Sequence, residues 1–177
     1  MKVPGIFFLV FLFALPAVPA DARGWYMDAG LEFVEVGEDL SAVDLGLGLA
    51  LEFGFEFAPG ASLNLGIGSS GHTENGWDIT YSRFWIGPRV IFDAGAIKPY
   101  FEGGLMSHFV DYDYTFYEID GTGLYFGGGA FWPVAGGGGF GVYLKYTAWE
   151  GEGNSGYISD QGDVTTTVMG VNYFFGF

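Results

Sequence analysis

The chain has 177 residues, with 21 Asp and Glu against 6 Lys and Arg, and it contains no cysteine. The formal net charge of −15 excludes nucleic acid as a partner, because phosphate contacts need Lys and Arg. The absence of cysteine excludes disulfides, thiol nucleophiles and thiolate metal sites. Charged residues make up 15% of the chain, against about 25% in soluble domains, so the protein must either bury much of its surface or present it to something other than water.

The first predicted element is a secretory signal peptide. Lys2 precedes the apolar run IFFLVFLFAL at 6–15, and VPADA at 18–22 offers small residues for cleavage after Ala20 or Ala22. A membrane-spanning helix would need roughly 20 apolar residues, and Pro16 and Pro19 end the run before that. We therefore expect a signal peptide at 1–22 and a single domain at 23–177.

The exported part predicts eight β-strands. In VDLGLGLALEFGFEF, Val43 to Phe57, every odd position is Val, Leu or Phe, and every even position is Asp, Gly, Ala or Glu. Such period-2 alternation is the primary sign of a strand. It recurs at about 25–36, 43–57, 61–68, 80–92, 98–110, 122–132, 140–149 and 163–177. The sixth stretch is the weakest, because it carries glycine on both faces.

The connections alternate between short and long. APG, DAGAI and PVAGGGG are turn-like, whereas SSGHTENGWD, DYDYTFYEIDGTG and EGEGNSGYISDQGD are longer. Short periplasmic turns and longer external loops are typical of outer-membrane barrels. The sequence thus predicts an all-β fold, an eight-stranded antiparallel up-and-down transmembrane barrel.

The composition of the two faces predicts which of them points inward. A soluble lipocalin-type barrel would share the alternation but turn the apolar face inward. Here the other face holds mainly glycine with a few charges, which suits a narrow interior better than a solvent surface. Aromatic residues near the strand ends are expected at the two membrane interfaces: Trp25, Phe57, Phe92, Tyr100, Trp132 and Phe140 on the turn side, and Trp77, Tyr81, Phe109 and Trp149 on the loop side. An eight-stranded interior is filled by side chains, so we expect no open pore.

Two segments carry a resemblance to a known group. The C-terminal VNYFFGF, with Tyr173, Phe175 and Phe177 on one face, resembles the final strand of outer-membrane barrels, which the barrel-assembly machinery recognises. IGPRVIFDAGAIKPYFEGGL, 86–105, is similar to the opacity-type and OmpA/OmpX-type eight-stranded barrels. The resemblance implies the outer membrane of a Gram-negative bacterium, with outer-membrane lipid and lipopolysaccharide as surroundings. It implies no activity.

The inward registry predicts a polar interior. The inward acids are expected to be Asp28, Glu32, Asp44, Glu52, Glu56 and Glu102, and the inward bases Arg83, Arg89 and Lys145. Buried charges must be paired, so we predict a cluster of Glu52, Arg89, Glu102 and Lys145. We interpret it as a plug that specifies the barrel, with a gate as the alternative. Some of the excess acids are expected near the wet barrel ends or with raised pKa values.

Barrels resembling the lipid A deacylase use a His and a Ser for catalysis, so the two histidines of the exported part are candidates for such a pair. Ser107 and His108 are adjacent in a strand and must point to opposite faces. His72 is expected in a loop beside Ser69, Ser70 and Glu74. Neither arrangement predicts an enzyme, and no cofactor or metal site is expected.

The predicted external loops are acidic, with no Lys or Arg. Their twelve acids are Glu38, Asp39, Glu74, Asp78, Asp111, Asp113, Glu118, Asp120, Glu150, Glu152, Asp160 and Asp163. Asp111, Asp113, Glu118 and Asp120 are the candidate contacts for a cationic partner, or for one bridged by a divalent cation, although their spacing matches no established calcium loop. The predicted function is structural or a surface interaction. The alternatives are a narrow conduit for small hydrophobic molecules, as in OmpW-like barrels, and a lipid A-modifying enzyme. The conduit would need a hydrophobic inner wall, and the predicted inner face is too polar.

Overall fold

The computed structural model describes residues 24–38, 40, 43–74, 76–112, 118–134, 138–154 and 159–176. The predicted signal peptide and its cleavage points lie outside these residues, as do Asp39, Asp113 and Phe177. Among the described residues, none forms a helix that is long and apolar enough to cross a membrane.

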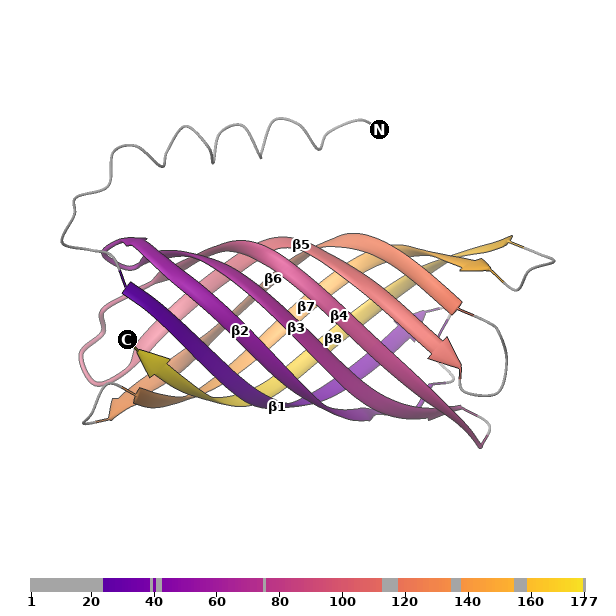
Figure 1. Cartoon of the computed structure of the whole chain (residues 1–177), viewed down its shortest axis with the longest axis horizontal. Coiled ribbons are helices and arrows are strands. Elements are labelled where there is room, and N and C mark those ends of the chain that lie inside the picture. The colour runs from indigo at the N-terminus through magenta and orange to yellow at the C-terminus, as the bar shows by residue number, and fades with distance from the viewer. Residues whose placement is uncertain are drawn as a thin grey trace, which may run out of the picture.

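Eight antiparallel strands form a closed barrel in which each strand pairs with its neighbours in sequence, and β8 closes on β1 (Figure 1). This confirms the predicted fold class. The strands are β1 (Gly24–Glu38), β2 (Gly46–Ala58), β3 (Ala61–Glu74), β4 (Trp77–Ile91), β5 (Lys98–Tyr112), β6 (Glu118–Val134), β7 (Gly138–Asn154) and β8 (Ser159–Gly176).

Strand β6 runs unbroken through its glycines and pairs with β7 along its whole length. The glycines make room for large side chains of the neighbouring strands. A Cβ on Gly129 would lie 2.8 Å from the Tyr100 ring, and one on Gly127 would lie 3.0 Å from Cγ of Lys145. Glycine is thus needed where β6 faces the crowded interior.

Much of the sequence expected in external loops belongs to strands instead. β3 and β4 extend to Glu74 and Trp77, and their turn includes Gly76 at a positive φ of 86°. β6 begins at Glu118, while β7 runs to Asn154. Ladder hydrogen bonds to a neighbouring strand outweigh the turn-like composition of these segments. The strands have 13 to 18 residues, more than the 9–11 needed to cross a bilayer.

The outer wall changes character along its height. Its apolar zone presents large side chains outward, and Leu124, Phe101 and Leu49 are 72%, 67% and 66% exposed. Farther toward the β3–β4 turn, the outward positions become polar, as at Glu35, Thr80, Asp111, Asp120 and Glu150. The apolar face therefore points away from the barrel, as expected for contact with lipid.

The interior is polar where the outer wall is apolar, and apolar where the outer wall is polar. Beside the polar outer wall, the inward positions are apolar: Val34, Val36, Ile79, Val110, Ile119 and Val164 form a buried cluster with Tyr81 and Trp149. The placement of Tyr81, Tyr100 and Trp149 at the membrane interfaces was therefore wrong, since all three are buried inside the barrel. They share the strand parity of Arg83, Glu102 and Lys145, which alternation directs inward. The inner face, which was predicted to be polar, is therefore apolar in this part of the barrel.

Candidate functional site

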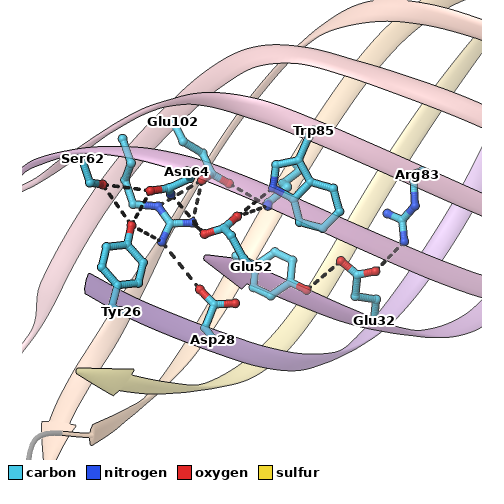
Figure 2. A network of polar contacts seen from close by, with 12 residues as sticks. Tyr26, Asp28, Glu32, Glu52, Ser62, Asn64, Arg83, Trp85 and Glu102 are labelled. Carbon is cyan, nitrogen blue, oxygen red and sulfur yellow. Dashed lines mark hydrogen bonds and ion pairs between the residues drawn. The ribbon is translucent and has the colours of Figure 1, made fainter. Parts of the chain in front are cut away.

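The structure brings the four residues of the predicted interior cluster together (Figure 2). Nε and Nη2 of Arg89 donate to Glu102 Oε2 at 3.0 and 2.7 Å, and Nη2 also donates to Glu52. Nζ of Lys145 lies 3.0 Å from Glu52 Oε2 and 3.2 Å from Glu102 Oε1. The two cations are thus each shared by the same two carboxylates. We call these four residues the plug.

The sheet registry explains this arrangement. Arg89 and Glu102 are direct partners on β4 and β5, so their side chains leave the sheet side by side. Glu52 on β2 is paired with Gly66 of β3. The missing side chain at Gly66 leaves space for the Trp85 indole, whose Nε1 donates to Glu52 Oε2 at 2.8 Å.

Uncharged residues that were not predicted from the sequence complete the plug. Nδ2 of Asn64 donates to Glu52 Oε1 at 3.1 Å. The Tyr26 hydroxyl contacts Ser62 Oγ at 2.9 Å and also bonds Asn64. Nη1 of Arg89 donates to the same Tyr26 hydroxyl at 3.3 Å. The only sequence signal for these residues was inward strand parity.

Asp28 adds a third carboxyl group to the two in the plug. Its Oδ2 lies 3.7 Å from Nη1 of Arg89 and has no hydrogen-bond partner. Aromatic rings stabilise the two cations, since Arg89 Cζ lies 4.3 Å from the Tyr100 ring centroid and Lys145 Nζ lies 4.1 Å from that of Trp85. Oppositely charged groups and ring faces therefore surround both cations.

A second ion pair, Arg83 with Glu32, lies apart from the plug (Figure 2), and Arg83 lies over the ring of Tyr81 from the apolar cluster. The Tyr143 hydroxyl donates to Glu32 Oε1 at 2.7 Å. Both members were predicted to point inward, and both are buried.

Two of the predicted inward acids lie at barrel ends. Glu56 is half-buried, and its Oε1 accepts from the Gly60 amide at 2.9 Å, which closes the β2–β3 turn. Asp44 is exposed, and its Oδ2 accepts from Thr73 Oγ1 at 2.9 Å. The inward prediction for Asp44 was wrong because β2 begins only at Gly46.

The two histidines differ in how well they were predicted. Ser107 points outward and contacts Thr122 Oγ1 at 3.1 Å, while His108 is buried inside, as alternation required. His72, expected in a loop, lies in β3. Its Nε2 contacts Ser70 Oγ at 2.8 Å and its Nδ1 contacts the Asp44 carbonyl at 2.8 Å. Ser70 and His72 are 3% and 5% exposed, so this pair is shielded from any outside substrate.

Three of the four candidate acidic contacts lie on strands, not in loops, and Asp113 lies outside the described residues. Asp111 belongs to β5, and Glu118 and Asp120 belong to β6. All three are exposed, and Asp111 is the direct partner of Glu118. Among the described residues, no three His, Asp or Glu side chains converge as they would around a metal ion.

The proposed assembly signal lies at the end of β8. Tyr173 and Phe175 have rings 4.6 Å apart on the outward face, and Phe177 lies outside the described residues. Between them, Phe174 points inward and packs against Tyr26 and Phe131, with ring centroids 4.9 and 5.3 Å away. The last strand therefore contributes to both faces of the wall.

No protein-family model matches the chain, and no curated protein sequence matches it. Several solved structures are similar. Neisserial surface protein A is 13% identical, with a TM-score of 0.71 over 86% of this chain and 97% of that one. The outer membrane protein OprG from Pseudomonas aeruginosa is 15% identical, with a TM-score of 0.61 over 88% and 97%. The attachment invasion locus protein Ail of Yersinia pestis is 16% identical, with a TM-score of 0.55 over 87% and 99%.

These similarities cover nearly the full length of each known protein. At such low identity they establish the fold, which is that of small outer-membrane β-barrels. Ail has also been solved in complex with the heparin analogue sucrose octasulfate.

Proposed function

We propose that the protein is a sealed barrel of the Gram-negative outer membrane that carries an acidic wall on the cell surface, with a structural or surface-interaction role. The outward apolar zone supports the membrane location, because lipid is the medium that stabilises such a surface. Two observations together carry the proposal. The interior is filled by side chains, and the polar zone of the outer wall presents carboxylates and hydroxyls. The plug supports the absence of a pore, since its side chains span the lumen from β2, β4, β5 and β7.

The acidic wall consists of the exposed carboxylates Asp111, Glu118 and Asp120. Their charge favours a cationic partner, or a partner bridged by a divalent cation. Asp111 and Glu118 are direct cross-strand partners, and like charges in such positions repel each other. A cation between them would relieve that repulsion. The ligand in the Ail complex, sucrose octasulfate, is an anion and needs a cationic surface. We therefore expect this barrel, with its acidic wall, to bind cationic partners instead.

Binding to a cationic probe tests the surface role. The full barrel is refolded in vesicles of zwitterionic lipid and titrated with oligolysine at low salt. We expect binding that weakens as salt rises and that falls strongly in Asp111→Asn/Glu118→Gln/Asp120→Asn. The matched control is Asp93→Asn, an acid in the β4–β5 turn at the opposite end. Equal binding by the triple variant and the control would refute the acidic wall as the contact surface.

A planar-bilayer recording tests the seal. We expect no steady ion current through the protein, because the plug fills the lumen. A stable single-channel conductance that increases with Glu52→Gln would instead identify the plug as a gate.

A conduit for small hydrophobic molecules is the second candidate function, and it is favoured by the apolar inner zone around Ile79, Val110 and Val164. The plug lies farther along the barrel axis than this zone, on the side away from the β3–β4 turn. It blocks passage straight through the barrel, so such molecules would have to leave sideways into the membrane. Faster uptake of an alkane by cells expressing the barrel, lost in Val110→Asp, would support this function. Uptake equal to that of cells without the barrel would exclude it.

We propose no enzymatic activity. The structurally similar barrels support this choice at the level of fold, and the burial of Ser70 and His72 supports it at the level of the site. A change in lipid A mass that depends on His72 or His108 would overturn it.

A further inference from the structure

The outer wall of the barrel contains an open hollow with a volume of about 440 Å³, within the range of about 300–1,000 Å³ that is usual for small-molecule sites. It crosses four neighbouring strands, from β2 to β5, and its lining is almost entirely apolar. Arg83 borders it, but the side chain of Arg83 is fully buried inside the barrel. The lining in the described part of the chain therefore presents no charge. The large side chains around the hollow are Leu49, Leu51, Ile67, Phe84 and Phe109.

The register of the sheet explains why the wall is hollow here. Leu49 is the direct partner of Ser69, and Ser69 is the direct partner of Ser82. Ser82 is in turn the direct partner of Phe109. Two small side chains therefore stand between two large ones, which project outward and are 66% and 51% exposed.

The two ends of the hollow differ in polarity. Farther from the β3–β4 turn, the next row across the strands consists of the large apolar side chains Leu51, Ile67 and Phe84. Nearer the turn, the next row pairs Gly71 with Thr80, and the outer wall becomes polar there. The hollow thus runs from a polar border into the apolar zone.

The two serine hydroxyls between these ends are weakly satisfied. Ser82 Oγ donates to Ser69 Oγ at 3.5 Å, which is long beside the usual 2.7–2.8 Å between hydroxyl oxygens. A hydroxyl both donates and accepts, and in this contact Ser69 accepts, so it can still donate to a further acceptor. Pure hydrocarbon supplies no acceptor. The pair therefore favours a ligand that carries an oxygen atom at this point.

A lipid acyl chain matches these properties. The hollow is continuous with the lipid-facing zone of the outer wall, and an empty hollow would forfeit dispersion contacts that a flexible chain restores. The ester carbonyl at the head of such a chain is an acceptor for Ser69. A second barrel fits less well, because its convex wall would rest on the projecting side chains of Leu49 and Phe109 and leave the serines uncovered.

We propose that the hollow binds one acyl chain of a membrane lipid. The ester group of that lipid lies at Ser69 and Ser82, and the chain continues over Ile67 and Phe84 toward the membrane centre. Because Asp111 adjoins the polar border of the hollow as the partner of Thr80, the lipid belongs to the leaflet on the side of the acidic wall. Binding here is independent of the surface-interaction role proposed above, since no carboxylate of the acidic wall takes part.

A lipid titration tests this site in the full barrel, labelled with ¹³C in its Leu and Ile methyl groups and refolded in a short-chain zwitterionic detergent. Phosphatidylcholine is added from substoichiometric amounts upward. We expect the methyl resonances of Leu49, Leu51 and Ile67 to shift and to saturate at about one lipid per barrel. Leu124 and Leu144, which are exposed on the apolar outer wall of β6 and β7, are internal controls and should respond only at higher lipid content. Equal responses of both groups would overturn the proposal, because they would show general solvation by lipid.

Three variants complete the test. Ser82→Leu fills the floor of the hollow and should abolish the early response. Ser107→Leu makes the same change on the outward face of β5, outside the hollow, and should leave the response unchanged. Ser69→Ala keeps the hollow open but removes the donor, so it should weaken lipid binding about fivefold, the contribution of one ordinary hydrogen bond.

A second copy of the barrel is the competing occupant. A sample that mixes two differently labelled copies distinguishes it from lipid. Nuclear Overhauser contacts from the Ile67 methyl groups to lipid methylene groups are expected. Contacts from Ile67 to the other copy would overturn the proposal and identify the hollow as part of a dimer interface. An early lipid response that persists in Ser82→Leu would overturn it as well, because the lipid would then bind elsewhere.

Discussion

At the scale of single residues, the stability of the plug depends on the free-energy cost of removing its charged groups from water. A buried ion pair gives little net stability by itself, because removing charges from water costs about as much as their attraction returns. Its strong effect is seen when one partner is lost. Arg89 bonds two carboxylates and the Tyr26 hydroxyl and lies over the Tyr100 ring.

Replacing Arg89 with Met should destabilise the barrel by about 3–5 kcal/mol, because it strands buried carboxylates without their main cation. Urea unfolding of the refolded protein in detergent, followed by tryptophan fluorescence, measures the loss. Lys98→Met is the matched control, since it removes a base that pairs with the exposed Asp93 and should cost at most about 1 kcal/mol. Part of the loss should return in Arg89→Met/Glu102→Gln. Equal losses in the two single variants would contradict this account of the plug.

At the scale of elements, glycine positions set how closely large side chains approach the wall. On β3, Gly66 lies under the Trp85 indole, and an added Cβ would overlap the ring. Gly71, five residues along the same strand, faces outward with nothing within 4 Å of its ideal Cβ position.

Gly66→Ala should therefore cost about 1–3 kcal/mol through overpacking, and it should weaken the bond from Trp85 to Glu52. Gly71→Ala should be neutral or slightly stabilising, because it lowers the entropy of the unfolded chain. Unfolding midpoints of the two variants, measured in parallel, check the pair. Similar destabilisation by both would show that β3 tolerates no side chain for backbone reasons alone.

At the scale of the whole molecule, the inner and outer faces of the barrel wall have opposite polarity at each height, and both change along the barrel axis. In the apolar outer zone the interior is ionic, and beside the acidic outer zone the interior is built of Val, Ile and aromatic side chains. The barrel thus has the polarity of a membrane protein over part of its height and that of a water-soluble β-barrel over the rest.

Charge placed at different heights on β7 tests this division. Leu144→Arg, in the apolar zone, should destabilise the barrel in bilayers by about 2–4 kcal/mol, whereas Glu150→Arg, on the same face in the polar zone, should cost about 0–1 kcal/mol. Unfolding in lipid vesicles measures both. Equal costs would mean that the apolar zone does not meet lipid.

Gel mobility gives a simpler check on closure. The unboiled protein should migrate faster in SDS than the boiled protein, because a closed barrel keeps its hydrogen bonds in detergent. Identical mobility, with the protein found in the soluble periplasm, would contradict membrane insertion.

Local alternation was enough to predict eight strands, their order and the facing of residues such as Glu52 and Arg89, because side-chain direction in a strand depends only on parity. It could not place Tyr26 of β1 beside Asn64 of β3, which lies two strands away. That contact depends on the stagger between strands, which the closure of the whole barrel sets. Strand lengths were underestimated where polar residues such as Thr73 and Asp120 lie on the polar part of the outer wall but remain in the ladder. Tyr81 and Trp149 were misplaced although parity alone would have put them inside.

The plug also constrains the order in which the protein can be assembled. Arg89 and Glu102 are 13 residues apart and can meet within a single hairpin. Glu52 and Lys145 are separated by 93 residues, and Glu32 and Tyr143 by 111. A chain inserted only as far as β6 would hold Glu52 and Glu102 with a single shared cation. The arrival of β7 supplies the second cation, so the final hairpin completes the internal charge balance at the same time as it closes the ring.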